Sequence, residues 1–384
     1  MSEFQYYEFL AVDRPLTDAD RKAMRGISSR ARITATSLVN TYEWGDFKGD
    51  PVKLMERCFD LHLYWANWGT HRLAVRLPAR LLDRALLARC MGDGDAIKLH
   101  EAGANVVLDI WSQDDEGGGN EDWEQDWYDD GVLMQALAPL RAGLLGGDLR
   151  LYYLVWLLGV TWGVFGPEDA EPLPGLGPMD AAVLAFGRFF EVDADLMHAA
   201  ADRPAAPPEA AAPPDAGRRY IRSLTDAEKS EMLLRVLEGD AHAGTDLRAG
   251  LRARLAAGTP ADPAPPRTVA DLHVRTAEVR QARERAEAEA AAKAKRRQEE
   301  AARKAQRLRV DALAERGDDV WAEIEAEIER RNAGGYNRAV EVLADLQIVA
   351  REAGTAAAFA RRMEGIRGRH ASKKRFMERI EGIS

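Results

Sequence analysis

Hydrophobic and polar positions form short strand-like runs over the first third of the chain, with helical spacing between some of them. The segments YYEFLAV at 6–12, ARITATSLVNTYEW at 31–44 and HRLAVRLP at 71–78 are rich in aromatic and β-branched residues and predict strands. Thr17 before two aspartates is typical of a helix N-cap. Apolar residues recur at helical spacing in DPVKLMERCFDLHLYWANW at 50–68. The predicted order is therefore β-α-β-(β)-α-β.

A strand at residues 42–47 would complete the element order of a ferredoxin-like split βαβ sheet. The segments at 96–103 and 105–113 predict a hairpin that extends this sheet, and three helical segments follow within residues 131–190. We therefore predict an α+β fold. Its N-terminal domain, residues 1–201, has a sheet first and helices afterwards.

Two proline-alanine stretches, residues 202–217 and 258–268, carry too little apolar surface to offset the entropy of ordering, so they predict linkers. Between them, Thr225 and Glu228 have the spacing of a capping box, which predicts a small helical insert over residues 218–257.

Residues 269–313 consist almost entirely of strong helix formers and predict one long charged helix. Leu272 and Val279 are followed in the same heptad register by Lys293 and Glu300, so a coiled-coil seam stops halfway. We expect this helix to be a solvent-exposed arm. Residues 314–384 regain helical apolar spacing and predict a helical hairpin or a three-helix bundle.

Charge and cysteine content indicate the compartment and the partners. Residues 267–384 hold 26 basic and 21 acidic residues, whereas the preceding part holds 27 and 42. The two cysteines lack metal or redox spacing, and no signal peptide pattern is present, which favours the cytoplasm. The apolar run at 151–165 is shorter than the roughly 18 residues of a membrane span and predicts a buried core helix.

The segment TYEWGDFKGDP at 41–51 is the first candidate site. As a ligand-binding loop it would use two aromatic side chains for stacking and two charged ones for polar contacts: Tyr42, Trp44, Asp46 and Lys48. The alternative is structural, with the aromatic residues packing on one side of a strand and Asp50 starting the next helix as its N-cap.

Two charged segments offer further candidates. The acidic, tryptophan-containing segment 113–131 fits a divalent-cation loop, a docking segment for a basic partner, a mimic of nucleic-acid charge, or a solvated loop. In the long helix, nucleic-acid phosphates would contact the basic side chains Lys293, Lys295, Arg296, Arg297, Arg303 and Lys304. The alternative here is a soluble helix surface, because glutamates interrupt the basic run. No catalytic residue, metal ligand set or cofactor motif is predicted.

The segments YYEFLAVDRPLT, SSRARITATSLVNTYEWGDFKGDP and HLYWANWGTHRLAVRLP resemble an uncharacterised family of bacterial proteins, and the resemblance covers most of the chain. It implies no activity. The segments YNRAVEVLADLQIVAREAG and RHASKKRFMERI resemble the helical tail of bacterial SWIM zinc-finger proteins. The cysteine and histidine motif of those proteins is absent, so this resemblance implies no zinc site.

Three hypotheses follow. The first is a cytoplasmic, non-enzymatic interaction or scaffold protein with a protein partner. The second is a nucleic-acid-associated protein that binds through the basic helix. The third is an enzyme with a site in the N-terminal domain. None of them involves a membrane, and the sequence indicates no oligomeric state.

Overall fold

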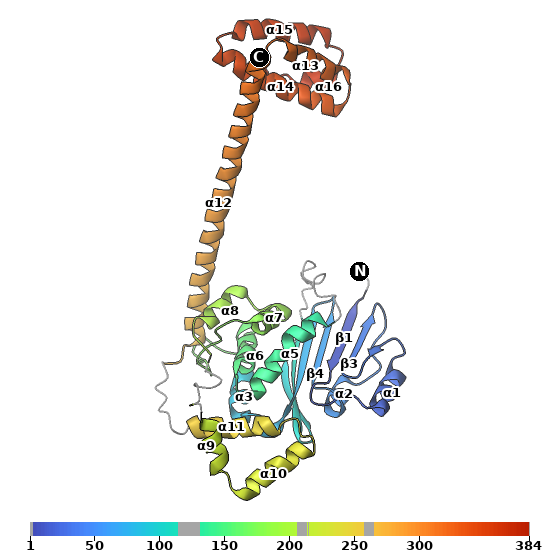
Figure 1. The fold of residues 1–384 in the computed structure, drawn as a ribbon, viewed down its shortest axis with the longest axis vertical. Coiled ribbons are helices and arrows are strands. Elements are labelled where there is room, and N and C mark those ends of the chain that lie inside the picture. Colours follow the sequence, from blue (N-terminus) through green and yellow to red (C-terminus); the bar gives the residue numbers. More distant parts are fainter. Residues whose placement is uncertain (1–2, 114–130, 206–212, 214, 257–264, 384) are drawn as a thin grey trace. The chain divides into compact units, whose positions relative to one another are not determined.

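A computed structural model describes residues 3–113, 131–205, 213, 215–256 and 265–383 of the chain (Figure 1). Two compact units are present, Met1–Gln281 and Ala282–Ser384. The first contains an antiparallel sheet with helices, and the second is helical, so the fold class is α+β, as predicted.

The sheet of the first unit has seven strands among the described residues, in the order β2-β3-β1-β4-β5-β7-β6, and every pair of neighbours is antiparallel. The strands are β1 (Gln5–Leu10), β2 (Arg32–Ile33), β3 (Ser37–Tyr42), β4 (Leu61–Ala66), β5 (Thr70–Pro78), β6 (Ile97–Ala102) and β7 (Asn105–Gln113). With α1 (Asp18–Ile27) and α2 (Pro51–Arg57), the chain runs β-α-β-β-α-β up to β4. The predicted hairpin at 96–113 is confirmed as β6 and β7.

Two predicted elements are wrong in detail. The expected strand at 42–47 is absent, because β3 ends at Tyr42 and Gly45 has a φ of 81°, a backbone conformation incompatible with a strand. The second strand instead comes from a division of the run 31–44 into β2 and β3. Helical spacing at 50–68 holds only for α2, since residues 61–66 form β4. All six residues of β4 are buried, so β4 lacks the alternation of apolar and polar residues that identifies a strand with one face in solvent.

Helices cover both faces of the sheet. On one face lie the 3₁₀ turn η1 (Ala79–Leu81) and α3 (Arg84–Met91), α5 (Val132–Leu145), α6 (Arg150–Thr161), α7 (Ala181–Phe189) and α8 (Ala194–Ala201) (Figure 1). Residues 151–160 of α6 are buried, which confirms the predicted core helix. The opposite face packs on α1 and α2 through Phe9, Leu38 and Phe59.

Among the described residues, no single helix has the length and apolar content needed to cross a membrane. The bent pair of α5 and α6 meets that test by length and composition only.

A buried carboxylate joins several elements of the first unit. Asp60 is fully buried just before β4 and accepts hydrogen bonds from the Arg76 guanidinium at 2.7 Å and the Arg141 guanidinium at 3.3 Å. The backbone N–H groups of Val12 and Asp13 donate to its other oxygen at 2.7 and 2.9 Å. Because these donors come from β5, α5 and the segment after β1, Asp60 fixes three elements against the start of β4.

The helical insert belongs to the first unit. It consists of α9 (Ala216–Ser223), α10 (Asp226–Leu237) and α11 (Ala243–Ala256), and the predicted capping box at Thr225 and Glu228 is confirmed. Arg80 pairs with Asp246 at 2.8 Å, which ties α11 to the turn after β5. Most of the predicted linkers 202–217 and 258–268 lies outside the described residues.

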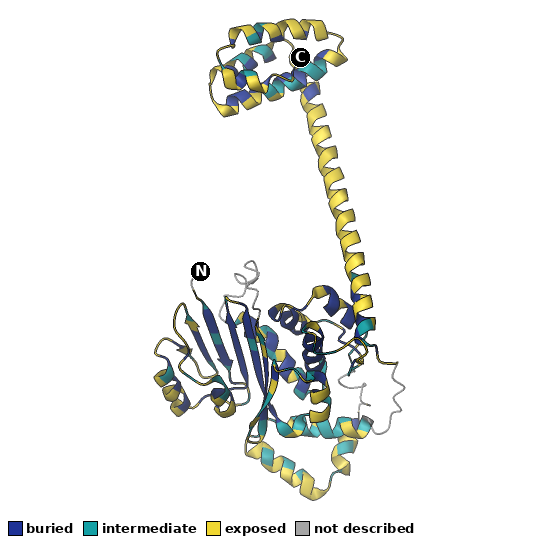
Figure 2. Cartoon of the chain, turned by 180° about the vertical axis from the view of Figure 1, so that it is seen from behind, coloured by how far each residue is buried: buried dark blue, intermediate teal, exposed yellow. Residues whose placement is uncertain are grey.

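The second unit begins within a single helix. The predicted long helix is confirmed as α12 (Val269–Arg316), with 48 residues, and every residue of it from 280 to 309 is exposed (Figure 2). Four helices follow instead of the expected two or three: α13 (Asp319–Glu329), α14 (Ala333–Glu352), α15 (Ala356–Arg369) and α16 (Lys374–Arg379). Gly354, with a φ of 70°, separates α14 from α15. The four helices share a core that includes Ile324, Leu343 and Phe376.

Candidate binding site at the edge of the sheet

The outer edge of β3 is only partly covered. β2 pairs with Leu38 and Val39 alone, whereas β3 continues to Tyr42, and no other described strand lies on that side. The chain before β2 is held by side chains instead, because Asn40 Nδ2 donates to Ser28 Oγ at 3.0 Å. About three residues of β3 therefore present an edge without a neighbouring strand.

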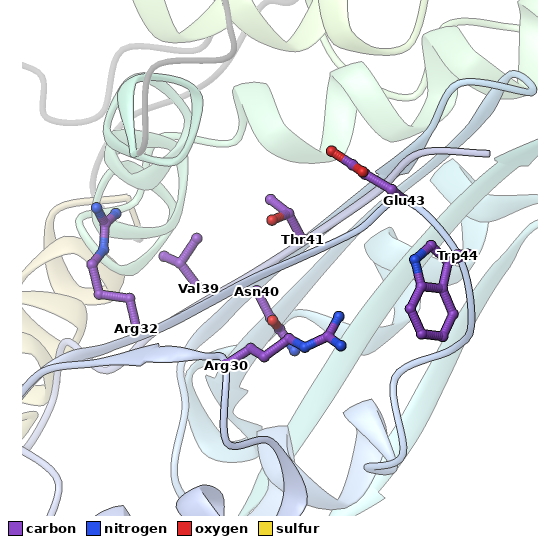
Figure 3. Close-up of a pocket in the computed structure, with 7 residues that line it drawn as sticks. All are labelled: Arg30, Arg32, Val39, Asn40, Thr41, Glu43 and Trp44. Atoms are coloured by element: carbon purple, nitrogen blue, oxygen red, sulfur yellow. The ribbon is translucent and has the colours of Figure 1, made fainter. Parts of the chain in front are cut away.

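A cavity of about 370 Å³ lies along this edge (Figure 3). Its lining residues come from β2, from β3 and from the segments before β2 and after β3: Arg30, Arg32, Val39, Asn40, Thr41, Glu43 and Trp44. Val39, Thr41 and Glu43 project to one side of β3, as the strand period requires. Asn40 projects to the other side, where it donates to Ser28 and Tyr42. The cavity therefore surrounds the strand edge and is bounded by residues from both faces.

Trp44 forms one end of the cavity. Its side chain is 69% exposed, and the Arg30 guanidinium lies over the indole at 5.4 Å from the ring centroid (Figure 3). Arg32 adds a second guanidinium, and Glu43 is the one carboxylate among the lining residues that the structure describes. This arrangement can bind a carboxylate or another anion next to a flat apolar group.

The structure brings only one of the four predicted loop residues to this cavity. Trp44 lines it, while Tyr42 lies on the opposite face of the sheet with its ring 5.9 Å from that of Tyr7. Asp46 is exposed and accepts a hydrogen bond from Gln5 at 3.4 Å. Lys48 is exposed outside the cavity lining.

The rest of the loop is anchored to the sheet. Phe47 is 9% exposed, and its ring stacks on that of Tyr7 with the centroids 5.0 Å apart. Gln5 Nε2 donates to the Gly45 carbonyl at 3.0 Å. Asp50 accepts from Lys53 N at 3.2 Å and is the N-cap of α2, which confirms the predicted helix start. Trp44 is therefore exposed although the loop around it is fixed.

The sheet face behind this loop is aromatic and largely dry. Burial raises the pKa of the Tyr7 and Tyr64 hydroxyls above their usual range, and each is raised further by the charge of Asp46. Arg72 forms a bidentate pair with Asp109, with both distances 2.8 Å. The Tyr7 hydroxyl donates to Gln5 Oε1 at 2.8 Å, so this face supports the loop through Gln5.

The predicted basic residues of the arm are exposed on α12. At 100° per residue, five of them share one side of the helix over roughly 17 Å: Lys293, Arg296, Arg297, Arg303 and Lys304. Lys295 lies on the other side, and Glu300 lies within the basic row. The acidic segment 113–131 falls outside the described residues except for its two ends.

A larger cavity of about 510 Å³ is a weaker candidate. Prolines form much of its lining, and its buried carboxylate, Glu171, is already paired with Arg267 at 2.6 Å. The Tyr153 hydroxyl donates to the same carboxylate. Its two lining arginines come from different segments, and one of them, Arg203, already donates to the Pro265 carbonyl at 3.0 Å.

Sequence reasoning did not identify Arg30 and Arg32 as site residues. The available signal was their spacing in SSRAR, since residues two apart lie on one side of an extended segment. Comparison with protein-family models, with curated proteins and with solved structures found no match for this chain.

Proposed function

We propose that this chain is a cytoplasmic, non-enzymatic interaction protein that binds an extended acidic segment of a protein partner along the open edge of β3. The proposal depends on one observation: an edge of β3 that no other described strand covers runs through a cavity that contains two arginines and an exposed tryptophan. An extended peptide adds to such an edge through main-chain hydrogen bonds, and side-chain pockets provide specificity.

Charge complementarity supports an acidic partner segment. Among the described lining residues, the two arginines Arg30 and Arg32 outnumber the one carboxylate, Glu43. Guanidinium groups bind carboxylates in bidentate geometry, and tryptophan and arginine are the residues that dominate binding energy at interfaces. Trp44 offers a large flat surface on a fixed loop, so little conformational entropy is lost when a partner covers it.

The test starts from heptapeptides displayed on phage and selected on the full chain. We expect enrichment of peptides with aspartate or glutamate. Trp44→Ala should weaken their binding by about 2 kcal/mol, roughly thirtyfold. Because Trp44 is largely exposed, the free energy of unfolding should change by less than about 0.5 kcal/mol. Trp68→Ala is the matched control, since Trp68 is exposed at 39% in the turn between β4 and β5 and does not line the cavity.

N-methylation of the selected peptide tests strand addition directly. In an added strand, alternate N–H groups face β3 and the others face solvent. Methylation of one alternating set should abolish binding, and methylation of the other set should leave it almost unchanged. Equal tolerance of both sets, or equal binding by wild type and Trp44→Ala, would show that β3 is not the docking edge.

The second candidate function is association with nucleic acid through α12. It is favoured by the row of five cations on one side of an exposed helix. Its binding should fall steeply with salt and should weaken in the control variant described below, which replaces two cations of this row, Arg297 and Arg303.

A further inference from the structure

We infer that the C-terminal helical unit contains a separate binding site for phosphate groups, in the cavity between the start of α14 and the start of α16. The cavity has a volume of about 380 Å³. Five cationic side chains line it, and its described lining contains no carboxylate: Arg331, Lys373, Lys374, Arg375 and Arg379. This inference is independent of the proposed binding at β3.

The cations converge from two segments that are distant in sequence. Arg331 lies in the turn between α13 and α14, whereas the other four belong to α16 and the turn before it. Lys373 donates to Glu329 at 2.6 Å and to the Ile328 carbonyl at 3.5 Å, which ties this turn to the end of α13. Tyr336 and Phe376 pack with their ring centroids 5.6 Å apart and hold α14 against α16. The walls of the cavity are therefore fixed by packing.

The positive charge is only partly compensated. Glu329 pairs with Lys373 and lies 3.8 Å from Arg331 Nε. Within the described residues, neither Lys374 nor Arg375 forms an ion pair. Like charges held together without a counter-charge repel one another, and this repulsion is relieved when an anion binds.

The backbone of Arg331 supports a role for its side chain. Its φ is 52°, the left-handed region, which a non-glycine residue adopts at a cost of order 1 kcal/mol. Glycine would suit this backbone better, yet a guanidinium is placed at the cavity instead.

The chemistry of the lining points to a ligand recognised by its phosphates. Arginine and lysine are the usual partners of phosphate oxygens. The aromatic residue in the lining, Tyr336, is only 8% exposed and so offers no face on which a base could stack. A chain of phosphates, either in a free polyphosphate or in a nucleic-acid backbone, meets these requirements.

Titration calorimetry of the full chain with inorganic tripolyphosphate tests the site. The variant Lys374→Ala/Arg375→Ala/Arg379→Ala should bind at least about tenfold more weakly than wild type, because each lost contact is a charge-assisted hydrogen bond. The control Lys295→Ala/Arg297→Ala/Arg303→Ala removes the same charge from α12 and should bind within about twofold of wild type. Absent binding by wild type at 50 mM salt, or equal losses in both variants, would overturn the inference.

A second variant separates charge from folding. Arg331→Gly removes one lining guanidinium and suits the positive φ, so the unit should be at least as stable as wild type while tripolyphosphate binding weakens. Unchanged binding by Arg331→Gly and by the triple cavity variant would contradict the site.

Competition identifies the source of the phosphates. A fluorescent single-stranded DNA oligonucleotide that tripolyphosphate displaces from wild type would assign the cavity to a nucleic-acid backbone. Binding of tripolyphosphate without binding of the oligonucleotide would assign it to a free polyphosphate. An oligonucleotide that binds equally to the cavity variant and to wild type, and that tripolyphosphate does not displace, would exclude a nucleic-acid backbone as the ligand of the cavity.

Discussion

His62 makes the stability of the first unit depend on pH in a defined way. It lies fully buried in β4, with its ring stacked on that of Phe9 at a centroid distance of 4.0 Å. Nδ1 lies 3.0 Å from the Glu8 carbonyl and donates to it, while Nε2 has no hydrogen-bond partner among the described residues. Burial, together with the positive charge of Arg72, lowers the pKa of His62 to about 3. The imidazole is therefore neutral in the folded chain.

The direction of the pH effect follows from the protonation of His62 in the unfolded and folded states. In the unfolded chain the pKa of His62 is about 6.5, so the unfolded state gains a proton below this pH. The folded state gains it only near pH 3. The free energy of unfolding is therefore fully maintained above about pH 6.5 and is lost as the pH falls towards 3. Between pH 7 and pH 5 the loss is about 2 kcal/mol, set by the unfolded-state pKa alone.

The variant His62→Phe keeps the stacking on Phe9 and removes the proton site. When the pH is lowered from 7 to 5, the free energy of unfolding should decrease in both proteins. The decrease should be about 2 kcal/mol smaller in the variant than in wild type, whatever the stability of the variant at pH 7. Hydrogen exchange of the β1 and β4 amides, corrected for intrinsic rates, measures this in the first unit alone. Such a local measurement is needed because two compact units violate simple two-state unfolding.

His273→Phe, at an exposed position of α12, is the control for the replacement of an imidazole by a phenyl ring. A His62→Phe variant with the same pH dependence as wild type would refute the reasoning. It would mean that His62 titrates alike in both states.

Two further predictions concern the support of the candidate site. Asp60→Asn should lower the free energy of unfolding of the first unit by about 3–5 kcal/mol, because it leaves the guanidinium of Arg76 without its buried carboxylate. Hydrogen exchange of the β4 and β5 amides measures this, and a change below about 1 kcal/mol would contradict the role of Asp60. Phe47→Ala should lower the free energy of unfolding of the first unit by about 3 kcal/mol. It should also weaken peptide binding at β3, because the loop that carries Trp44 loses its anchor. An unchanged affinity for the selected peptide would show that other contacts hold the loop.

The elements that the sequence predicted well carry local signals. The capping box at Thr225 and the uninterrupted helix formers of α12 act within one turn or within one helix, so no tertiary contact was needed to recognise them. The sequence did not predict β4, because its signal depends on what tertiary packing covers. Its strand period is visible only where one face is polar, and helices cover both faces of this central strand.

The candidate site could be predicted only in part, because its residues come together through strand pairing. Trp44 drew attention as an aromatic residue in a loop, whereas Arg30 lies fourteen positions earlier in an ordinary polar run. Only the short pairing of β2 with β3 places the two side chains together. The basic cavity of the second unit was missed for the same reason, since Arg331 and the lysines near 373 are distant in sequence.

The segment at 41–51 acquires its mixed composition from two opposite requirements. Phe47 faces inwards and anchors the loop, while the exposed Asp50 is the N-cap of α2, so both side chains are explained by stability. Trp44 contributes little to that stability, because most of its surface remains in water. An exposed aromatic residue alone is common on protein surfaces and indicates nothing. Its position at the end of an open strand edge, under the guanidinium of Arg30, is what makes it a candidate for binding and separates it from the rest of the loop.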